Sequence, residues 1–360
     1  MSGKIRVIVC GTTFGQHYLK ALEQLRGQFE VAGLFAKGSE RSRLCAEKHN
    51  IPLYTSMADL PEDIDLACVV IRSGAIGGKG TEVALQFLEK GISVIQEQPI
   101  HPKDLELCHR TARKHKVHFM TGDLYPNLPE VERFITIARE LNKTEAPVYV
   151  NASFAPQVSY PAMDILMQAL PSVRNWKIYH LTQEVGPFDV LVGELGSIPI
   201  TIEYHNQINP HDPDNYMHLL HNIALVYESG RLTLEDTFGP VTWKPRMHIP
   251  TLLYNTANAE ETYPAYLDEN SMEILGDYKS RSFKSVVTQG WPYAISKDLI
   301  SVRELILGEK NVNQKAQQEI LCALQWTEMT KTFGYARLTE DNERHYTPFQ
   351  MIKMTADSIK

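Results

Sequence analysis

Cysteine is scarce in this sequence and follows no recognisable spacing. The chain has 5 cysteines among 360 residues, at positions 10, 45, 68, 108 and 322. An odd, scattered set argues against a disulfide framework, and without a CxxC pair the usual signature of a zinc knuckle is missing. The 13 histidines form no HExxH pattern either. We therefore expect no metal site.

Long apolar runs and concentrations of positive charge are also absent. No stretch reaches the roughly 20 apolar residues that a membrane-spanning helix requires, and no secretory signal pattern precedes the first strand-like segment. The formal net charge is -7, with no arginine-rich tract, which disfavours nucleic acid as a partner. The sequence predicts a cytoplasmic globular protein that binds neither membranes nor nucleic acid.

The length and a change of pattern near Thr121 predict two domains. A chain of 360 residues exceeds what one hydrophobic core usually holds. In residues 1–121, short apolar strands alternate with helical patterns, which predicts an α/β Rossmann domain with a doubly wound parallel sheet. The predicted strands span residues 5–10, 30–36, 66–71, 92–95 and 117–120.

Residues 122–360 follow a different pattern and are expected to form a second α/β domain. Longer strand-like segments separated by turn signals predict a largely antiparallel, open sheet. These strands are expected at 148–154, 176–181, 198–205, 219–227 and 231–234, helices at 130–141, 162–169 and 313–332, and long loops at 245–288. The last helix or tail is a candidate to pack back on the first domain.

A glycine-containing turn follows the first predicted strand and consists of Gly11, Thr12, Thr13, Phe14 and Gly15. Glycine here permits a tight turn and the close approach of a pyrophosphate to a helix N-terminus. Thr13 replaces the second glycine of G-x-G-x-x-G, and the last glycine comes one residue early. A plain strand-to-helix turn is therefore the alternative, but the surrounding βαβ units favour a dinucleotide-binding loop.

The end of the second strand indicates which dinucleotide is bound. An NAD-binding domain usually places Asp or Glu there, to hold the ribose 2′-hydroxyl. This chain has no acid at the strand end, and instead opens the next helix with Lys37, Gly38, Ser39, Arg41 and Ser42. Cations and hydroxyl groups at a helix N-terminus suit a 2′-phosphate, so NADP(H) is the predicted cofactor. The alternative is a solvated helix start with Arg41 facing water.

A glycine-rich segment follows the strand at 66–71 and contains Arg72, Ser73, Gly77 and Gly78. Because ligands bind at the carboxyl ends of the strands in open α/β sheets, these glycines predict close approach to the nicotinamide or the substrate. A flexible loop is the alternative.

Glu97, Gln98 and Pro99 follow the strand at 92–95. With the Rossmann half and the antiparallel second half, this E-K-P-like tripeptide resembles the glucose-fructose oxidoreductase and inositol dehydrogenase family over nearly the whole chain. In that family the lysine of E-K-P contacts substrate and cofactor. Gln98 takes its place here and carries neither the charge nor the proton, which disfavours sugar dehydrogenation.

A narrower resemblance rests on five short motifs in order. They are Phe14-Gly15 with Tyr18-Leu19, Gly38-Ser39 with Arg41-Ser42-Arg43, Arg72-Ser73 with Gly77-Gly78 and Gly80-Thr81, Gln96-Glu97 with Pro99 and His101-Pro102, and Tyr125-Pro126. Together they resemble the thiazolinyl imine reductases of nonribosomal siderophore assembly, of the pyochelin and yersiniabactin type. The resemblance implies NADPH-dependent reduction of a thiazoline C=N to a thiazolidine. The implied substrate is held as a thioester on a carrier domain of the peptide synthetase.

The same resemblance suggests roles for three further residues. It implies that His101 and Tyr125 are proton donors and that Asp164 contacts substrate. The alternative roles are purely structural: His101 as a helix cap, Tyr125 as a packed side chain, and Asp164 as a first-turn acid favoured by the helix dipole. It also implies a homodimer that pairs through the exposed face of the second sheet.

Aromatic side chains in the second half are a further candidate for substrate contact. The sequence allows two roles, lining an aryl-binding cleft or packing in the core, for Trp243, Tyr254, Tyr263 and Tyr266.

Two other functions remain open at this point. One is an NADP-dependent sugar or polyol dehydrogenase of the wider family. The other is a non-catalytic NADP-binding regulator, which the fold alone does not exclude.

Overall fold

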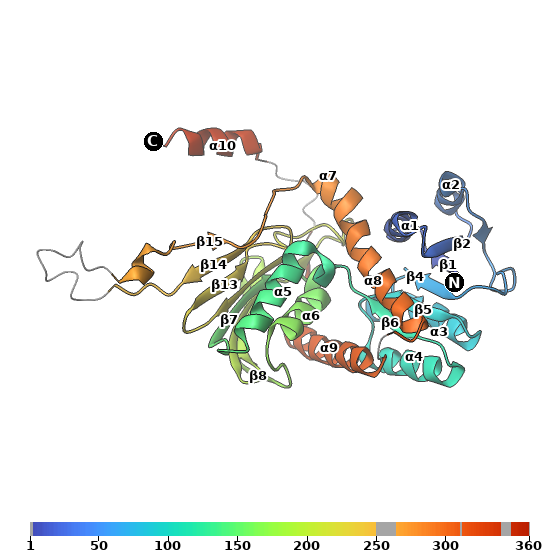
Figure 1. Ribbon diagram of the computed structural model, residues 1–360, viewed down its shortest axis with the longest axis horizontal. Coiled ribbons are helices and arrows are strands. Elements are labelled where there is room, and N and C mark those ends of the chain that lie inside the picture. Colours follow the sequence, from blue (N-terminus) through green and yellow to red (C-terminus); the bar gives the residue numbers. More distant parts are fainter. Residues whose placement is uncertain (1–2, 250–263, 310–311, 340–346, 360) are drawn as a thin grey trace, which may run out of the picture.

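The computed structural model describes residues 3–249, 264–309, 312–339 and 347–359. These residues contain a six-stranded and an eight-stranded sheet, each flanked by helices (Figure 1). The predicted architecture, a parallel Rossmann sheet followed by a largely antiparallel sheet, is confirmed.

The Rossmann sheet has the strand order β3-β2-β1-β4-β5-β6, and its neighbouring strands pair in parallel. Its strands are β1 (Ile5–Cys10), β2 (Phe29–Phe35), β3 (Leu53–Tyr54), β4 (Leu66–Val69), β5 (Ser93–Glu97) and β6 (Phe119–Gly122). The central strands are almost wholly buried, as expected when helices cover both faces. The order reverses between β1 and β4, which opens a crevice at the carboxyl edge of the sheet.

Four helices connect these strands: α1 (Gly15–Gln24), α2 (Glu40–His49), α3 (Gly80–Glu89) and α4 (Pro102–His115). Ser39 caps α2, because its hydroxyl accepts a hydrogen bond from the Ser42 amide at 3.4 Å. Pro102 stands in the first turn of α4, where its missing N–H costs nothing.

The second sheet has the order β15-β14-β13-β12-β7-β10-β9-β8. Its strands are β7 (Tyr149–Phe154), β8 (Trp176–Val185), β9 (Phe188–Leu195), β10 (Ile198–His205), β12 (His221–Val226), β13 (Gly230–Leu234), β14 (Val241–Pro245) and β15 (Glu273–Ile274). β7 and β10 pair in parallel, whereas the other pairs are antiparallel. The helices α5 (Pro129–Leu141) and α6 (Ser159–Ala169) lie against one face.

The stretch expected to form long loops, 245–288, contains short elements where it is described. These are the 3-10 turn η6 (Ala265–Asp268), the strand β15 and the helical turn α7 (Phe283–Ser285). Residues 250–263 of this stretch lie outside the described residues. A further short pair, β11 (Gln207–Ile208) and β16 (Arg337–Leu338), joins two distant parts of the second half.

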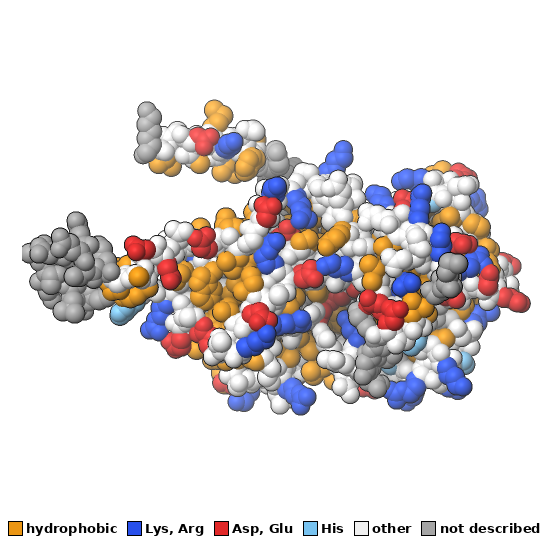
Figure 2. Space-filling model, viewed as in Figure 1, with side chains coloured by type: hydrophobic (Ala, Val, Ile, Leu, Met, Phe, Trp, Pro, Cys, Tyr) orange, Lys and Arg blue, Asp and Glu red, His pale blue; other side chains and the backbone are white. Residues whose placement is uncertain are grey.

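The C-terminal helices return to the first domain. α8 (Trp291–Ile306) packs along α1, and α9 (Val312–Phe333) contacts both α4 and α6. By contrast, α10 (Phe349–Asp357) lies apart from the body, with exposed side chains throughout (Figures 1 and 2). No helix in the described ranges has the length and apolar character needed to cross a membrane.

Candidate functional site

The turn between β1 and α1 has the geometry of a phosphate-binding loop. Gly11 has a φ of +98°, and a Cβ at this position would collide with the carbonyl oxygen of Val70, which directly follows the neighbouring strand β4. Among the described residues, no side chain caps α1 and no acid stands in its first turn. The first amides of α1 therefore have no competing carboxylate, and Thr12 to Gly15 fit the pyrophosphate of a dinucleotide.

The start of α2 comes close to this loop. The Arg41 Nε donates to Thr12 Oγ1 at 3.3 Å, which places a guanidinium beside the phosphate loop. Lys37 is exposed nearby in the sequence, whereas the buried Ser42 donates its hydroxyl to the Ser39 carbonyl at 2.7 Å. Two predicted cations are thus accessible to a 2′-phosphate, while the two serines form the cap of α2. Gly38 has a φ of +77° and supplies the turn before that cap.

The glycine-rich loop after β4 folds on itself. A Cβ at Gly78 would collide with the carbonyl oxygen of Arg72, and one at Gly80 with that of Ile71. The loop's own backbone therefore accounts for these two glycines, without a ligand. Ser73 fixes the loop to the Glu-Gln-Pro turn, because its hydroxyl donates to the Pro99 carbonyl.

Arg72 lies at the edge of this loop and connects the two halves of the chain. Its guanidinium pairs with Asp214 of the second domain at 2.6 Å. Both side chains are largely exposed, so the pair contributes little to stability. Gly77, with a φ of +80°, ends the short 3-10 turn η1 (Gly74–Ile76) in the same loop.

The Glu-Gln-Pro turn holds a partly buried hydrogen bond that the sequence did not predict. The Tyr18 hydroxyl, from α1, donates to Glu97 Oε2 at 2.6 Å. Burial raises the pKa of Glu97 to about 8, the Tyr18 hydrogen bond acts against this shift, and the charge of Asp298 adds to it. Gln98 is half-buried beside Glu97, and its backbone N–H donates to the Gly122 carbonyl at 3.4 Å.

The structure places the two predicted proton donors in different settings. His101 is the N-cap of α4, and its Nδ1 accepts from the Lys103 amide at 3.3 Å. Tyr125 opens η2 (Tyr125–Asn127) after β6, and its ring meets the ring of His221 edge-on at 5.2 Å. Burial, followed by the charges of Glu97 and Asp123, raises the pKa of the Tyr125 phenol.

His221 supports Tyr125 from the second domain and is itself fixed. Its Nε2 donates to the Val158 carbonyl at 2.9 Å, and its Nδ1 lies 2.8 Å from the Thr237 hydroxyl. Burial lowers the pKa of His221 to about 4, so the imidazole is neutral at neutral pH. Tyr125 therefore packs on an uncharged ring.

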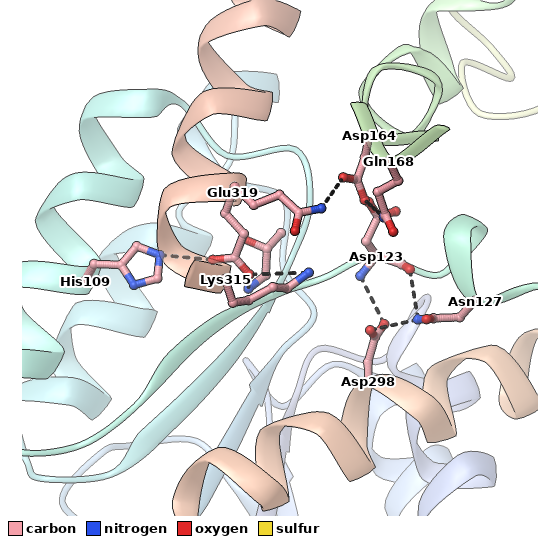
Figure 3. A network of polar contacts seen from close by, with 10 residues as sticks. His109, Asp123, Asn127, Asp164, Gln168, Asp298, Lys315 and Glu319 are labelled. Atoms are coloured by element: carbon pink, nitrogen blue, oxygen red, sulfur yellow. Dashed lines mark hydrogen bonds and ion pairs between the residues drawn. The ribbon is translucent and has the colours of Figure 1, made fainter. Parts of the chain in front are cut away.

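Asp164 belongs to a buried polar network between the domains (Figure 3). It accepts hydrogen bonds from Gln168 at 2.9 Å and from Gln318 of α9 at 3.4 Å. The interpretation of Asp164 as a first-turn acid is wrong, because α6 begins five residues earlier at Ser159. Burial and the charge of Asp164 together raise the pKa of Asp123.

Asp298 of α8 completes the acidic part of this network. Its carboxylate accepts from the Asp123 amide at 3.0 Å and from the Asn127 side chain at 2.8 Å. Burial raises the pKa of Asp298 to about 6. These bonds join the end of β6 to α8 across 175 residues of sequence.

Lys315 and Glu319 on α9 form the other side of the network in Figure 3. Glu319 accepts from the Thr121 amide at 2.9 Å and lies 3.0 Å from His109 Nε2. Burial alone would lower the pKa of Lys315, but the surrounding carboxylates, Glu319 and Asp164 first among them, outweigh it and raise this pKa. Sequence reasoning identified Asp164 but missed the rest of the network, because segments that are far apart in the chain meet only in the folded structure.

The remaining candidates lie away from this crevice or outside the described residues. Trp243 on β14 packs 6.4 Å from the ring of Tyr227, and Tyr266 is exposed. Tyr254 and Tyr263 lie outside the described residues. Where the chain is described, no group of three or more His, Cys, Asp or Glu side chains is arranged to hold a metal ion.

Family models match both halves of the chain. Residues 5–123 match GFO_IDH_MocA, an oxidoreductase family with an NAD-binding Rossmann fold. Residues 145–244 match the C-terminal domain model of Irp3-like thiazolinyl imine reductases. No curated protein sequence gives a significant match.

Solved structures share the fold at low sequence identity. A dehydrogenase from Chromobacterium violaceum has a TM-score of 0.66 and 12% identity, over 100% of both chains. KijD10, a 3-ketoreductase from Actinomadura kijaniata solved with NADP and TDP-benzene, has a TM-score of 0.65 and 14% identity, over 94% of this chain and 100% of its own.

An oxidoreductase from Agrobacterium radiobacter, in complex with NAD+, L-tartaric acid and magnesium, has a TM-score of 0.64 and 9% identity, over 90% of this chain and 95% of its own. Such likeness supports the fold, and the family models support the assignment of each domain. Residues 5–123 are therefore similar to the NAD-binding Rossmann domain of the GFO_IDH_MocA oxidoreductases, and residues 145–244 are similar to the Irp3-like C-terminal domain.

Proposed function

We propose that the protein is an NADPH-dependent thiazolinyl imine reductase. It reduces the C=N bond of a thiazoline to a thiazolidine on a carrier-bound siderophore intermediate of the pyochelin or yersiniabactin type. The observation that carries this proposal is the match of residues 145–244 to the Irp3-like model behind a GFO/IDH/MocA Rossmann domain. The neutral Gln98 in place of the family lysine supports it, because sugar chemistry would use that lysine.

NADPH fits the residues of the crevice. Thr12 to Gly15 would hold the pyrophosphate, while Arg41 and Lys37 would face the 2′-phosphate. When bound there, NADPH would supply the hydride for the imine carbon. The chain's own contribution is to hold substrate and cofactor in contact and to provide a proton for the nitrogen.

In this proposal His101 donates the proton and Tyr125 orients the ring nitrogen. In the structure Nδ1 of His101 accepts from the Lys103 amide and so carries no proton. To act as the acid, His101 must give up this capping bond and take up a proton at Nδ1, and the imidazolium then donates from Nε2. The raised pKa of Tyr125 keeps its phenol protonated, so it can donate a hydrogen bond to the nitrogen without losing its proton.

The proposal is tested by a substrate panel with purified enzyme and NADPH. We expect oxidation of NADPH with a synthetic hydroxyphenyl-thiazolinyl thioester. We also expect none of a set of polyols and inositols to be oxidised with NADP+. Turnover of a polyol would instead assign a sugar dehydrogenase. Binding of NADPH without turnover of any compound would favour a regulator.

A further inference from the structure

The buried Tyr18 and the partly exposed Glu97 form a hydrogen-bonded pair beside the cofactor crevice. We propose that Glu97, held by Tyr18, senses the oxidation state of the nicotinamide: it loses its proton when the oxidised cofactor binds and keeps it when the reduced cofactor binds. The inference needs a bound nicotinamide but no thiazoline substrate, so it extends beyond the proposed function.

The position of Glu97 in the sheet puts it on the nicotinamide side. A dinucleotide spans the point where the strand order reverses, here between β1 and β4, with one mononucleotide on each half of the sheet. The basic residues after β2 mark the adenosine half. Glu97 ends β5, in the other half, at the carboxyl edge where ligands bind.

Tyr18 fixes the carboxyl group in this place. It lies on α1, the helix whose N-terminus fits the pyrophosphate, and only 1% of its surface is exposed. Its hydroxyl reaches Glu97 Oε2 at 2.6 Å across 79 residues of sequence. A Cβ at residue 122 would collide with that hydroxyl, so Gly122 provides the space for the hydrogen bond.

In the part of the chain that the structure describes, the groups that act on the charge of Glu97 include no cation that would hold it ionised. They are Tyr18 on α1, Cys68 on β4, Asp298 on α8 and Tyr125 on η2. With its pKa raised to about 8, the carboxyl group is mostly protonated at pH 7. It therefore has a proton to release.

The two forms of the cofactor differ in charge at the ring. The oxidised nicotinamide carries a positive charge and the reduced ring is neutral, whereas the phosphates are the same in both. A positive charge beside Glu97 favours the carboxylate and lowers the pKa of this group. Linkage is reciprocal, so rising pH strengthens the binding of the oxidised form relative to the reduced form.

Proton release on binding tests the inference directly. NADP+ and NADPH are each titrated into weakly buffered protein at pH 7 with a pH indicator dye. We expect wild-type protein to release more protons with NADP+ than with NADPH, by up to about one per site. Glu97→Gln should abolish the difference. Glu89→Gln, at an exposed position on α3, is the matched control and should behave like wild type.

Tyr18→Phe provides a second variant that keeps the carboxyl group. Losing the hydrogen bond that favours the carboxylate should raise the pKa of Glu97, so the difference in proton release should persist to higher pH. Equal release with both nucleotides in wild type would overturn the inference, as would an unchanged difference in Glu97→Gln. An enzyme inert toward thiazolines but showing this pattern would contradict the proposed function alone.

Discussion

At the scale of single residues, the cofactor crevice depends on a few side chains whose roles can be predicted from the sequence. Arg41 is one of them, since its guanidinium lies beside Thr12 of the phosphate loop. His101 is another, although the structure shows its imidazole accepting a backbone hydrogen bond as a helix cap. Variants of Arg41 test its role in nucleotide binding, and variants of His101 distinguish proton transfer from helix capping.

Arg41→Ala should raise the Kd for NADPH and leave the Kd for NADH nearly unchanged. A hydrogen bond to a charged group contributes about 1.5–3 kcal/mol, and Arg41 is exposed, so we expect the lower end, roughly tenfold in Kd. Fluorescence titration of both nucleotides measures this. Lys48→Ala, at the other end of α2, should change neither value. Equal affinity of wild type for the two nucleotides would refute the preference for NADPH.

His101→Asn and His101→Ala should both lower kcat for thiazoline reduction, by a factor of ~10²–10⁴ if the imidazole is the acid. Asparagine is a good N-cap residue, so the first variant keeps the cap and the second loses it. If only the alanine variant loses activity, His101 acts as a cap. Tyr125→Phe should lower kcat less, because the proposed role of Tyr125 is to orient the nitrogen.

At the scale of elements, the Rossmann strands and helices were predicted well because their signals are local. Apolar strands buried on both faces, a serine cap at α2 and a proline in the first turn of α4 all act within a few residues. α8 was missed, although Ala294, Ile295 and Leu299 recur at helical spacing and are buried. Two short helical turns, Phe283–Ser285 and Val286–Gly290, run directly into α8, and the first of them lies in the stretch expected to form loops, so the sequence pattern did not mark where the helix begins.

The polar network between α6, α8 and α9 was beyond sequence reasoning for a different reason. Asp123 and Asp298 meet across 175 residues, and only the packed arrangement of helices brings them together. Tyr18 and Glu97 present the same difficulty. Local patterns predict elements, whereas contacts between distant elements require the fold itself.

The network makes stability depend on pH. The pKa of Asp298 is raised to about 6 in the folded protein. The protonated Asp298 therefore adds to the free energy of unfolding below about pH 4, and this stabilisation is lost as the pH rises toward 6. Asp298→Asn should remove this dependence. From pH 4 to pH 6.5, wild type should lose up to about 3 kcal/mol more in unfolding free energy than the variant, at about 1.4 kcal/mol per pKa unit. Urea unfolding at the two pH values measures the difference.

Asp59→Asn is the control for that series, because Asp59 is exposed in a loop of the first domain. It should follow wild type at both pH values. A variant Asp298→Asn with the same pH dependence as wild type would show that this carboxyl group does not titrate between the folded and unfolded states.

At the scale of the whole molecule, we propose that two copies associate through the exposed face of the second sheet. The helices α5 and α6 cover one face, and Val192 on β9 is 38% exposed on the other. Light scattering after size-exclusion chromatography should give twice the mass of one 360-residue chain. Val192→Lys should shift the population toward the single chain, and a monomeric wild type would contradict the proposal.

The central claim is the reduction of a thiazoline by NADPH, and an isotope measurement tests it most directly. The enzyme is incubated with a hydroxyphenyl-thiazolinyl thioester and NADPH deuterated at the transferred C4 position, and the product is analysed by mass spectrometry. The account predicts a thiazolidine that carries one deuterium on the former imine carbon. A thioester recovered unchanged, with the deuterium still on the nucleotide, would contradict it.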